Sequence, residues 1–363
     1  MKIFVVGYPS YVGGADTELW HTTRIWRDHE HEVSFIPTWH ADPEWKQKLA
    51  DIGCETHHAN PATLDKVSGL PGGVVVSFCN AQFLKLAPRL RKMGCRLVWL
   101  NCMTWAFADE LAFVTNHGPF DAHVYQSTFQ RQQLEPQYAT SGQKGNGVTK
   151  YDASIHGVQI RGAFDVSAWR FAPLPHIKRM NFCVGRLARD DPDKWSSNTW
   201  PIYERIQYSG IHAWLMGVNE KVYAKIGPPP HWATTLPANA ISAAEFYRKL
   251  HCLMPINGGA RENWPRVGLE AMAAGVPIVT HADWGWREMI RHGETGYLAS
   301  DDFEFAHWAA TLAHDEPLRL RIARQAREAL AQELANPERI GQQWNDLFTS
   351  LESQHAQPIA ATA

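Results

Sequence analysis

One pattern dominates the sequence: short, apolar, strand-like segments alternate with amphipathic helical stretches, in two successive series. Strands that are apolar along their whole length are typical of parallel sheets built from βαβ units. The sequence therefore predicts an α/β fold made of two successive units. The strands expected in the first series are residues 2–6, 32–36, 73–78, 96–100, 122–126 and 154–159, and those in the second are residues 181–185, 211–216, 233–236, 253–255 and 277–280.

The boundary between the two series is expected at Pro173-Leu174-Pro175. Two prolines in three residues favour a stiff, extended segment, because each fixes its own φ and restricts the residue before it. We therefore expect an N-terminal domain at residues 1–173, a C-terminal domain at residues 174–345 and a tail at residues 346–363.

Two further segments have a composition of their own. Residues 137–150 are polar and rich in Gly. They are expected to form a loop, either a plain surface insertion or a flap that contacts a second substrate. Residues 316–351 are rich in Arg, Ala, Leu and Gln, which predicts a helical stretch near the end of the chain.

The composition is that of a globular protein. Of the 363 residues 45% are hydrophobic and 20% are charged, which is enough apolar material for sizeable cores. The formal net charge of −2 argues against binding polyanions over the whole surface. One local basic stretch is either a solvated helix face or a contact for the phosphates of DNA or lipid. It comprises Lys85, Arg89, Arg91, Lys92 and Arg96.

Targeting, redox and metal signals are weak. The first seven residues read as a buried strand, and no run approaches the ~18 apolar residues of a membrane span, so we expect a cytoplasmic protein without a transmembrane segment. The six Cys contain no C-x-x-C pair and are expected to be buried free thiols. No His pair has metal-ligand spacing, so no metal site is predicted. The 16 Trp either stack on ligands or fill cores.

A glycine-rich turn follows the first expected strand. Gly13 and Gly14 directly precede a helical stretch, where backbone N–H groups can approach an anion. A dinucleotide site would require G-x-G-x-x-G and an acidic residue at the end of the second strand. Neither is present, so NAD binding is not expected. A plain tight turn and a ligand contact remain as alternatives.

Two glutamates flank the start of a helix in the second series. Pro265 suits the first helical position, with Asn263 or Trp264 as N-cap. Glu262 then lies before the helix and Glu270 about two turns into it. A helix N-terminus favours a phosphate, and carboxylates accept hydrogen bonds from sugar hydroxyls. The pattern therefore suits a nucleotide sugar, whereas the plain alternative is two solvated glutamates on a surface helix.

On these residues the sequence resembles the retaining GT-B glycosyltransferases of the family 4 type. Residues 262–280 are similar to the family's E-x7-E box with its E-A-M-A-x-G-x-P-[IV]-[IV] continuation. Four other segments resemble further family motifs. They are Gly13-Gly14-Ala15-Asp16-Thr17, Arg161-Gly162-Ala163-Phe164-Asp165, Val184-Gly185-Arg186-Leu187 followed by Lys194, and Trp284-Gly285-Trp286-Arg287-Glu288 followed by residues 293–298.

The resemblance implies a GT-B fold: two Rossmann-like domains that face each other across a cleft, with the C-terminal helix returning to the first domain. It also implies that Arg186 and Lys194 bind the donor diphosphate, with Arg189 competing for the second role because of an insert. Glu262 would contact the transferred sugar and Glu270 the ribose. The further donor-binding residues implied are Gly13, Gly14, Asn263, Trp264, Pro265, Arg266, Val267 and Leu236.

The implied activity is retaining transfer of a hexosyl or pentosyl group from a nucleotide sugar, such as UDP-glucose, to an acceptor hydroxyl. Arg186, Lys194 and Glu262 would be catalytic, without a metal ion or other cofactor. The His that many members carry after the fourth strand is missing here. Asn101 or Thr104 is expected to hold the sugar instead, with Glu110 as an acceptor contact.

Several acceptors and two other protein classes stay open at this point. The acceptor is a carbohydrate or small metabolite, a hydroxymethylated base in DNA as for the phage enzymes, or a lipid or polysaccharide. The alternatives of another class are a GT-B sugar-nucleotide epimerase and a non-catalytic sugar-nucleotide binder. The sequence carries no signal for the oligomeric state.

Overall fold

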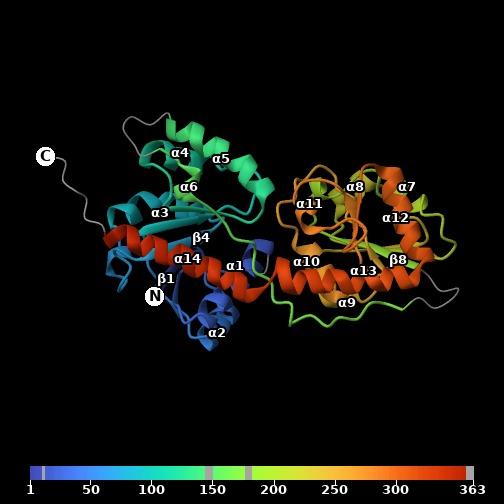
Figure 1. Cartoon of the computed structure of the whole chain (residues 1–363), viewed down its shortest axis with the longest axis horizontal. Coiled ribbons are helices and arrows are strands. Elements are labelled where there is room, and N and C mark those ends of the chain that lie inside the picture. Colours follow the sequence, from blue (N-terminus) through green and yellow to red (C-terminus); the bar gives the residue numbers. More distant parts are fainter. Residues whose placement is uncertain (10–12, 144–149, 176–181, 357–363) are drawn as a thin grey trace. The chain divides into compact units, whose positions relative to one another are not determined.

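The computed structural model describes residues 1–9, 13–143, 150–175 and 182–356 (Figure 1). It divides into two compact units, of which unit 1 comprises Met1–Phe164 with Pro337–Ala363 and unit 2 comprises Asp165–Asn336. The sequence placed this boundary at residues 173/174. Residues before that point join unit 2 because the Ala172 amide donates to the Ala274 carbonyl at 3.0 Å, and Arg327 donates to the Val166 and Trp169 carbonyls.

Unit 1 contains a seven-stranded sheet in the order β3-β2-β1-β4-β5-β6-β7, with every pairing parallel. Apolar strands alternate with helices, as the sequence predicted. Its strands are β1 (Lys2–Val6), β2 (Glu32–Ile36), β3 (Glu55–Thr56), β4 (Val74–Phe78), β5 (Arg96–Leu100), β6 (Ala122–Tyr125) and β7 (Gly157–Gln159). Its helices are α1 (Gly14–Asp28), α2 (Pro43–Asp51), α3 (Ala81–Lys92), α4 (Ala108–His117), α5 (Thr128–Gln143), α6 (Ala153–His156) and α14 (Pro337–Ala356), with a 3₁₀ turn at Leu64–Lys66.

Two local expectations in unit 1 are wrong. The segment 154–159 was expected to be one strand, but it begins as helix α6, because the Asp152 carboxylate accepts the Ser154 amide at 2.8 Å and caps a helical turn. The expected loop at residues 137–150 is helical as far as Gln143, as the end of α5. Residues 144–149 lie outside the described part of the chain.

The C-terminal helix α14 belongs to unit 1, as the family resemblance implied, and lies beside α1 (Figure 1). Trp344 packs edge-on against Trp26, with ring centroids 5.0 Å apart, and both indoles are buried. The predicted continuous helix 316–351 is broken before Pro337, because proline supplies no N–H and disfavours helical backbone in the residue before it.

Unit 2 contains a four-stranded parallel sheet in the order β10-β9-β8-β11 and a two-stranded parallel pair, β12-β13. Its strands are β8 (Phe182–Leu187), β9 (Ile211–Met216), β10 (Ala233–Leu236), β11 (Cys252–Leu253), β12 (Val279–His281) and β13 (Tyr297–Ala299). Its helices are α7 (Thr199–Glu204), α8 (Glu220–Ile226), α9 (Ala243–Tyr247), α10 (Arg266–Ala274), α11 (Trp286–Met289), α12 (Asp302–His314) and α13 (Glu316–Ala329), with a 3₁₀ turn at Pro192–Lys194 and a π-helical turn at Leu330–Leu334.

The register of unit 2 aligns the ends of its strands. Leu187 pairs with Met216, and Met216 with Leu236, so β8, β9 and β10 finish at the same edge. Ligands of open α/β sheets bind outside the carboxyl ends of the strands. A ligand site is therefore expected at the loops that leave this edge.

Other global expectations have mixed outcomes. Within the described ranges, no helix is long and apolar enough to cross a membrane. None of the six Cys forms a disulfide, but only Cys54, Cys95 and Cys252 are buried, so the expectation of uniformly buried thiols holds in part. No cluster of three or more potential metal ligands occurs among the residues that the structure describes.

Candidate functional site

Arg186 lies near the carboxyl end of β8, and its side chain is only 2% exposed. Its guanidinium carbon lies 5.1 Å from the ring centroid of Trp195, and one nitrogen donates to the Lys194 carbonyl. Its Nε and Nη1 are buried without a hydrogen-bond partner among the described residues. Burial lowers the pKa of Arg186 to about 10, so the group is still charged at neutral pH. A buried cation with unused donors suits an incoming anion.

Lys194 and Glu262 form an ion pair in the same region. Lys194 Nζ lies 2.8 Å from Glu262 Oε1, and each side chain is 18% exposed. The Glu262 charge also acts on Arg186, so three of the predicted site residues come together. Arg189, the other candidate for the second cation, is exposed. Lys194 therefore fits that role better, although its ion pair was not foreseen from the sequence.

The helix that follows Glu262 begins without a side-chain cap. Pro265 is the N-cap of α10, so the predicted N-caps Asn263 and Trp264 are wrong, and both lie buried before the helix. The N-cap Pro265 has no side-chain acceptor for the backbone amides in the first turn of α10. These amides at the positive end of the helix dipole form a second feature suited to a phosphate.

A glycine not assigned to the site from the sequence fixes the loop that carries Glu262. The Gly285 amide donates to the Glu262 carbonyl at 3.0 Å. A Cβ atom at Gly285 would lie 1.6 Å from the Asn263 carbonyl oxygen, so no larger residue fits without moving the loop. The signal was present in the motif around Trp284-Gly285-Trp286, but only the structure shows what the glycine contacts.

Glu270 lies on α10, partly buried against α9. Its Oε2 accepts the Tyr247 hydroxyl at 3.1 Å, and that hydroxyl lies 3.0 Å from the Val267 carbonyl. Burial raises the pKa of Glu270 to about 7, opposed by Arg266 and by the Tyr247 hydrogen bond. Glu270 thus has a protein partner that the sequence did not reveal.

The predicted donor residue Leu236 lines a surface pocket of about 480 Å³ at the end of β10. Its carbonyl accepts the amides of Gly217 and Val218 at 3.0 Å, which ties the loops after β9 and β10 together. The remaining lining side chains include Asn219, Tyr223 and Pro237. The volume is within the about 300–1,000 Å³ range of small-molecule sites.

The glycine turn of unit 1 also ends at an open helix terminus. Gly13 is the N-cap of α1 and provides no side chain to cap it, while Gly14 is the first helical residue. Asp16 lies in the first turn. Residues 10–12 lie outside the described part of the chain, so the turn that leads to Gly13 is not described.

The candidate contacts after β5 form a buried network instead of an open polar surface. Glu110 is fully buried and accepts hydrogen bonds from the Trp99 indole, the Asn101 amide, the Phe107 backbone and the Tyr138 hydroxyl. This arrangement does not fit the predicted acceptor contact, because both carboxylate oxygens are occupied from inside the protein. Burial raises the pKa of Glu110 to about 7.

Asn101 is equally committed to holding its own loop. Its Nδ2 donates to the Trp105 carbonyl and to Glu110, each at 2.9 Å, and its Oδ1 accepts the Met103 amide at 2.8 Å. The Thr104 hydroxyl is buried and has no hydrogen-bond partner among the described residues. Both side chains are therefore buried, and neither is exposed for the predicted contact with the sugar. Trp105 at the tip of this loop is 51% exposed.

Some of the Trp residues lie in the core and others at the surface. Trp26 packs on Trp344, and both are buried core residues like Trp45, on which the half-buried Trp20 packs. Trp264 and Trp286 in the motif region are buried too. Trp39 and Trp105 are exposed and follow β2 and β5, whose carboxyl ends lie at the same edge of the unit 1 sheet.

Two side chains of the basic stretch around α3 are bound to other residues of unit 1. Arg91 donates to the backbone carbonyls of His117, Gly118 and Pro119, and Arg89 pairs with Asp65 at 3.2 Å. Of its five cations, two are therefore engaged in contacts within unit 1. This favours the plain interpretation of a helix face over a nucleic-acid or lipid contact.

Residues 242–329 match the family model described as Glycosyl transferases group 1. The chain is 37% identical over 117 residues to an exopolysaccharide phosphotransferase of Streptomyces coelicolor, covering 31% of this chain and 12% of that protein. It is 36% identical over 90 residues to the N-acetyl-α-D-glucosaminyl L-malate synthase of Bacillus anthracis, covering 24% of this chain and 23% of that protein. The chain thus spans less than a quarter of the length of either relative.

The structural comparison covers almost the entire chain. The crystal structure of Anabaena HepE in complex with UDP-glucose matches with a TM-score of 0.70 at 18% identity, over 96% of this chain and 100% of that one. The chain has the GT-B glycosyltransferase fold. The segment matched by the family model contains Glu262, α10 and Glu270 of this GT-B protein, whereas Arg186 and Lys194 precede it.

Proposed function

We propose that this GT-B protein is a retaining glycosyltransferase of the family 4 type, which transfers a sugar from UDP-glucose or a similar nucleotide sugar to an acceptor hydroxyl. The observation that carries the proposal is the buried Arg186, whose Nε and Nη1 lack partners among the described residues, beside the Lys194–Glu262 ion pair. The presence of UDP-glucose in the HepE complex supports a uridine diphosphate donor.

Unit 2 is the proposed donor unit. The donor diphosphate would accept hydrogen bonds from Arg186, Lys194 and the first amides of α10, because each presents donors in the region of the strand ends. Glu262 would exchange part of its ion pair with Lys194 for a hydroxyl of the sugar. Glu270 would accept a ribose hydroxyl, and the pocket at Leu236 would hold the base.

The proposed reaction breaks the bond between the anomeric carbon and the diphosphate oxygen. The bonding electrons leave with that oxygen, and Arg186 and Lys194 stabilise the resulting negative charge. The acceptor oxygen bonds to the anomeric carbon on the same face, and its proton passes to the departing phosphate. Two fixed cations supply the charge that a divalent metal would otherwise supply, so we propose a metal-independent enzyme.

Unit 1 is the proposed acceptor unit, with the loop of residues 101–107 as its principal contact. Trp105 offers an exposed ring on a loop that Asn101 holds from beneath. Such a ring suits the apolar face of a carbohydrate. We therefore propose a carbohydrate or small metabolite as acceptor, for which transfer should depend little on salt concentration, unlike transfer to DNA.

The test is release of UDP from UDP-glucose, with products identified by mass spectrometry, in the wild type and three single variants. Arg186→Ala and Lys194→Ala should each lower turnover by at least about 100-fold, the scale of losing one charge-stabilising group. Arg189→Ala removes a neighbouring exposed cation and should leave turnover unchanged. EDTA should have no effect. Near-native turnover of both Arg186→Ala and Lys194→Ala would falsify the site, and inhibition by EDTA would contradict metal independence.

A further inference from the structure

A second cavity lies on unit 1, between α5 and the segment that contains α6. Its volume is about 620 Å³. It is lined by Glu135, Pro136, Ala139, Lys150, Tyr151, Asp152, Ala153, Ile155 and His156. This volume is within the range of small-molecule sites. None of these residues belongs to the motifs that indicated the donor site.

The cavity lies away from the carboxyl edge of the sheet. It is bordered by residues just before β7, and Gly157, the first residue of that strand, pairs with His123 on β6. The carboxyl end of β6 is instead at Tyr125, which pairs with Gln159. A ligand in this cavity would therefore occupy a place separate from the loops that carry Gly13 and Trp105.

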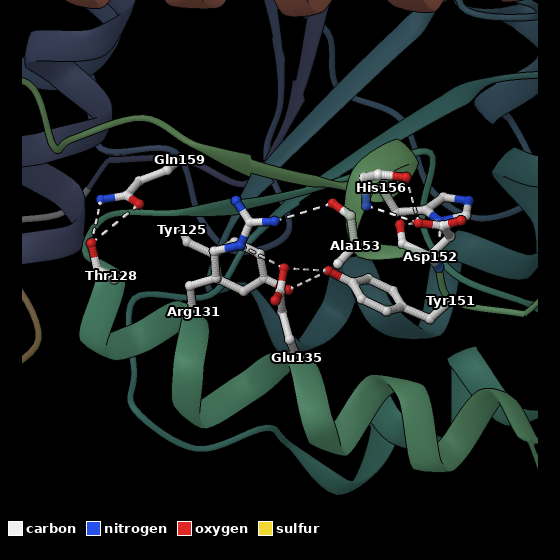
Figure 2. A network of polar contacts seen from close by, with 10 residues as sticks. Tyr125, Thr128, Arg131, Glu135, Tyr151, Asp152, Ala153, His156 and Gln159 are labelled. Carbon is white, nitrogen blue, oxygen red and sulfur yellow. Dashed lines mark hydrogen bonds and ion pairs between the residues drawn. The ribbon is translucent and has the colours of Figure 1, made fainter.

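A polar network fixes one wall of the cavity (Figure 2). Glu135 Oε1 accepts Arg131 Nε at 2.7 Å and the Tyr151 hydroxyl at 3.2 Å. The Tyr151 hydroxyl also lies 2.8 Å from that of Tyr125, and Arg131 donates to the Ala153 carbonyl at 3.1 Å. These contacts hold helix α6 against α5 without any ligand.

A glycine makes this packing feasible. A Cβ atom at Gly157 would lie 2.6 Å from Glu135 Oε1, 2.8 Å from the Ala153 carbonyl oxygen and 2.9 Å from the Tyr151 hydroxyl. Each distance is too short for a carbon atom. The network therefore depends on the absence of a side chain at the start of β7.

The wall leaves polar groups available to a ligand. Both hydrogen bonds to Glu135 fall on Oε1, and within the described residues none is made to Oε2. Asp152 likewise uses Oδ1 for the Ser154 amide and hydroxyl. The His156 ring turns Nδ1 to the Asp152 backbone, so Nε2 faces the opposite way. Lys150 adds an exposed ammonium group.

Two rings and an aliphatic side chain supply the apolar part. The Tyr151 and His156 rings lie 5.7 Å apart between centroids, at 31° to each other. Ile155, on the same short helix, is 57% exposed. Ring faces of this kind pack on the C–H face of a pyranose, while carboxylates, ammonium and imidazole groups match hydroxyls that both donate and accept hydrogen bonds.

We infer that this cavity is a second binding site, for a neutral saccharide. Arg131 is paired with Glu135, so the carboxylates of Glu135 and Asp152 are balanced by Arg131 and Lys150, and the wall has no net charge to favour an ionic ligand. No metal-binding cluster occurs among the described residues. The mixture of donors, acceptors and ring faces suits a neutral polyol better than a lipid or a simple cation. The inference does not depend on the proposed transferase activity, since it concerns binding at a different place.

The test is saturation-transfer-difference NMR on the full chain, without nucleotide sugar, with maltotriose, cellotriose and triacetylchitotriose as separate probes. At least one probe should receive saturation, and excess UDP-glucose should not displace it. Tyr151→Ala and His156→Ala should each weaken binding at least tenfold, as measured by titration. Tyr151→Phe retains the ring and should largely preserve binding.

The control variant is Phe303→Ala, which removes a 71% exposed aromatic ring from unit 2 and should bind as the wild type does. Circular dichroism establishes that each variant is folded, and His156→Ala tests the site even where Tyr151→Ala unfolds. Three results would overturn the inference: no probe binds, UDP-glucose displaces the probe, or the Tyr151 and His156 variants bind like the control. Failure of UDP-glucose turnover would refute the proposed function and leave this result unaffected.

Discussion

Among single residues, Arg186 is the one whose position is hardest to explain by stability alone. A buried guanidinium costs solvation free energy, and here two of its nitrogens gain no hydrogen bond from the described protein to offset it. Trp195 and the Lys194 carbonyl hold the group in place. We therefore propose that Arg186 is arranged for a ligand, at a cost in stability to the unliganded fold.

This arrangement leads to opposite effects of one substitution. Arg186→Met should leave the melting temperature unchanged or raise it in the absence of nucleotide, because an incompletely paired buried charge is replaced by an apolar side chain of similar length. The same variant should bind UDP at least tenfold more weakly. Differential scanning fluorimetry and calorimetric titration measure the two effects. A strongly destabilised variant would show that Arg186 has a mainly structural role.

The buried carboxyl of Glu110 should make the free energy of unfolding depend on pH. Burial raises its pKa to about 7 in the folded protein, from 4.5 for an ordinary Glu side chain. The folded state therefore retains a proton that the unfolded chain releases, so stability falls as pH rises from about 4.5 to about 7 and then levels off. The shift corresponds to about 3 kcal/mol. Glu110→Gln should flatten this profile in thermal unfolding between pH 5 and 8.

Glu270 provides the comparison, because burial raises its pKa to about 7 as well, in unit 2. Glu270→Gln should reduce the slope separately, and the double variant should reduce it further. An unchanged slope in Glu110→Gln would show that the carboxyl is ionised in the folded protein despite its burial.

At the scale of elements, the loops at strand ends are fixed by contacts from beneath. The Glu262 loop is tied to Gly285, and the loop after β5 is tied to Asn101, Glu110 and Gln130. The entropy cost of ordering such loops arises during folding and not during ligand binding. Changes to the supports should therefore act on ligand binding.

Gly285→Ala tests whether Gly285 supports the loop that carries Glu262, which we propose to bind the donor. The added methyl group would lie 1.6 Å from the Asn263 carbonyl oxygen, so the loop that carries Glu262 must move. We expect a loss of stability of about 1–3 kcal/mol and at least tenfold weaker binding of UDP-glucose, measured by titration. Gly293→Ala is the control for UDP-glucose affinity, because a Cβ atom there meets nothing within 4 Å, although its φ of +78° strains the substituted residue and costs stability of its own. Equal UDP-glucose affinity in the two variants would contradict this account.

Substitutions of Trp105 test whether the loop of residues 101–107 binds the acceptor. Trp105→Ala should raise the KM for the acceptor at least tenfold, while the affinity for UDP-glucose and the slow hydrolysis of UDP-glucose without acceptor stay the same. Trp105→Phe keeps a ring and should restore most of the acceptor affinity. Asn101→Ala releases the loop and should resemble Trp105→Ala. If Trp105→Ala leaves the acceptor KM unchanged, the ring is a surface feature without this function.

At the scale of the whole molecule, the chain leaves unit 1 at residue 165 and returns to it with α14. The helix completes a core around Trp26, Phe78, Trp344 and Phe348. Unit 1 therefore cannot be complete until the last helix has been synthesised, and the two units depend on different hydrophobic clusters.

Separate cores predict separable damage. Trp344→Ala should cost about 3–5 kcal/mol and speed amide hydrogen exchange in β1 and α1, with β8 and β9 unaffected. Phe305→Ala, in the core of unit 2, should have the reverse pattern. Exchange measured by mass spectrometry distinguishes the two. Equal acceleration in both units by Trp344→Ala would contradict this division of the cores.

The sequence by itself determined the alternation of strands and helices, the exact bounds of several strands, the start of a helix directly after Gly13 and the motif that surrounds α10. These are local patterns, set by the spacing of apolar residues and by turn chemistry within a few positions. The resemblance of separate motifs to one family also predicted the GT-B fold, because those motifs are spread over most of the chain.

Only the tertiary structure decided which polar residues face a ligand and which face the protein. Glu110 and Asn101 are polar residues after a strand, but Glu110 is enclosed by donors that include Tyr138, 28 residues away, and Asn101 is bound within its own loop. Lys194 meets Glu262 across 68 residues of sequence, and α14 returns to a core begun by β1. Burial and pairing of this kind arise between residues far apart in the chain, and no local pattern encodes them.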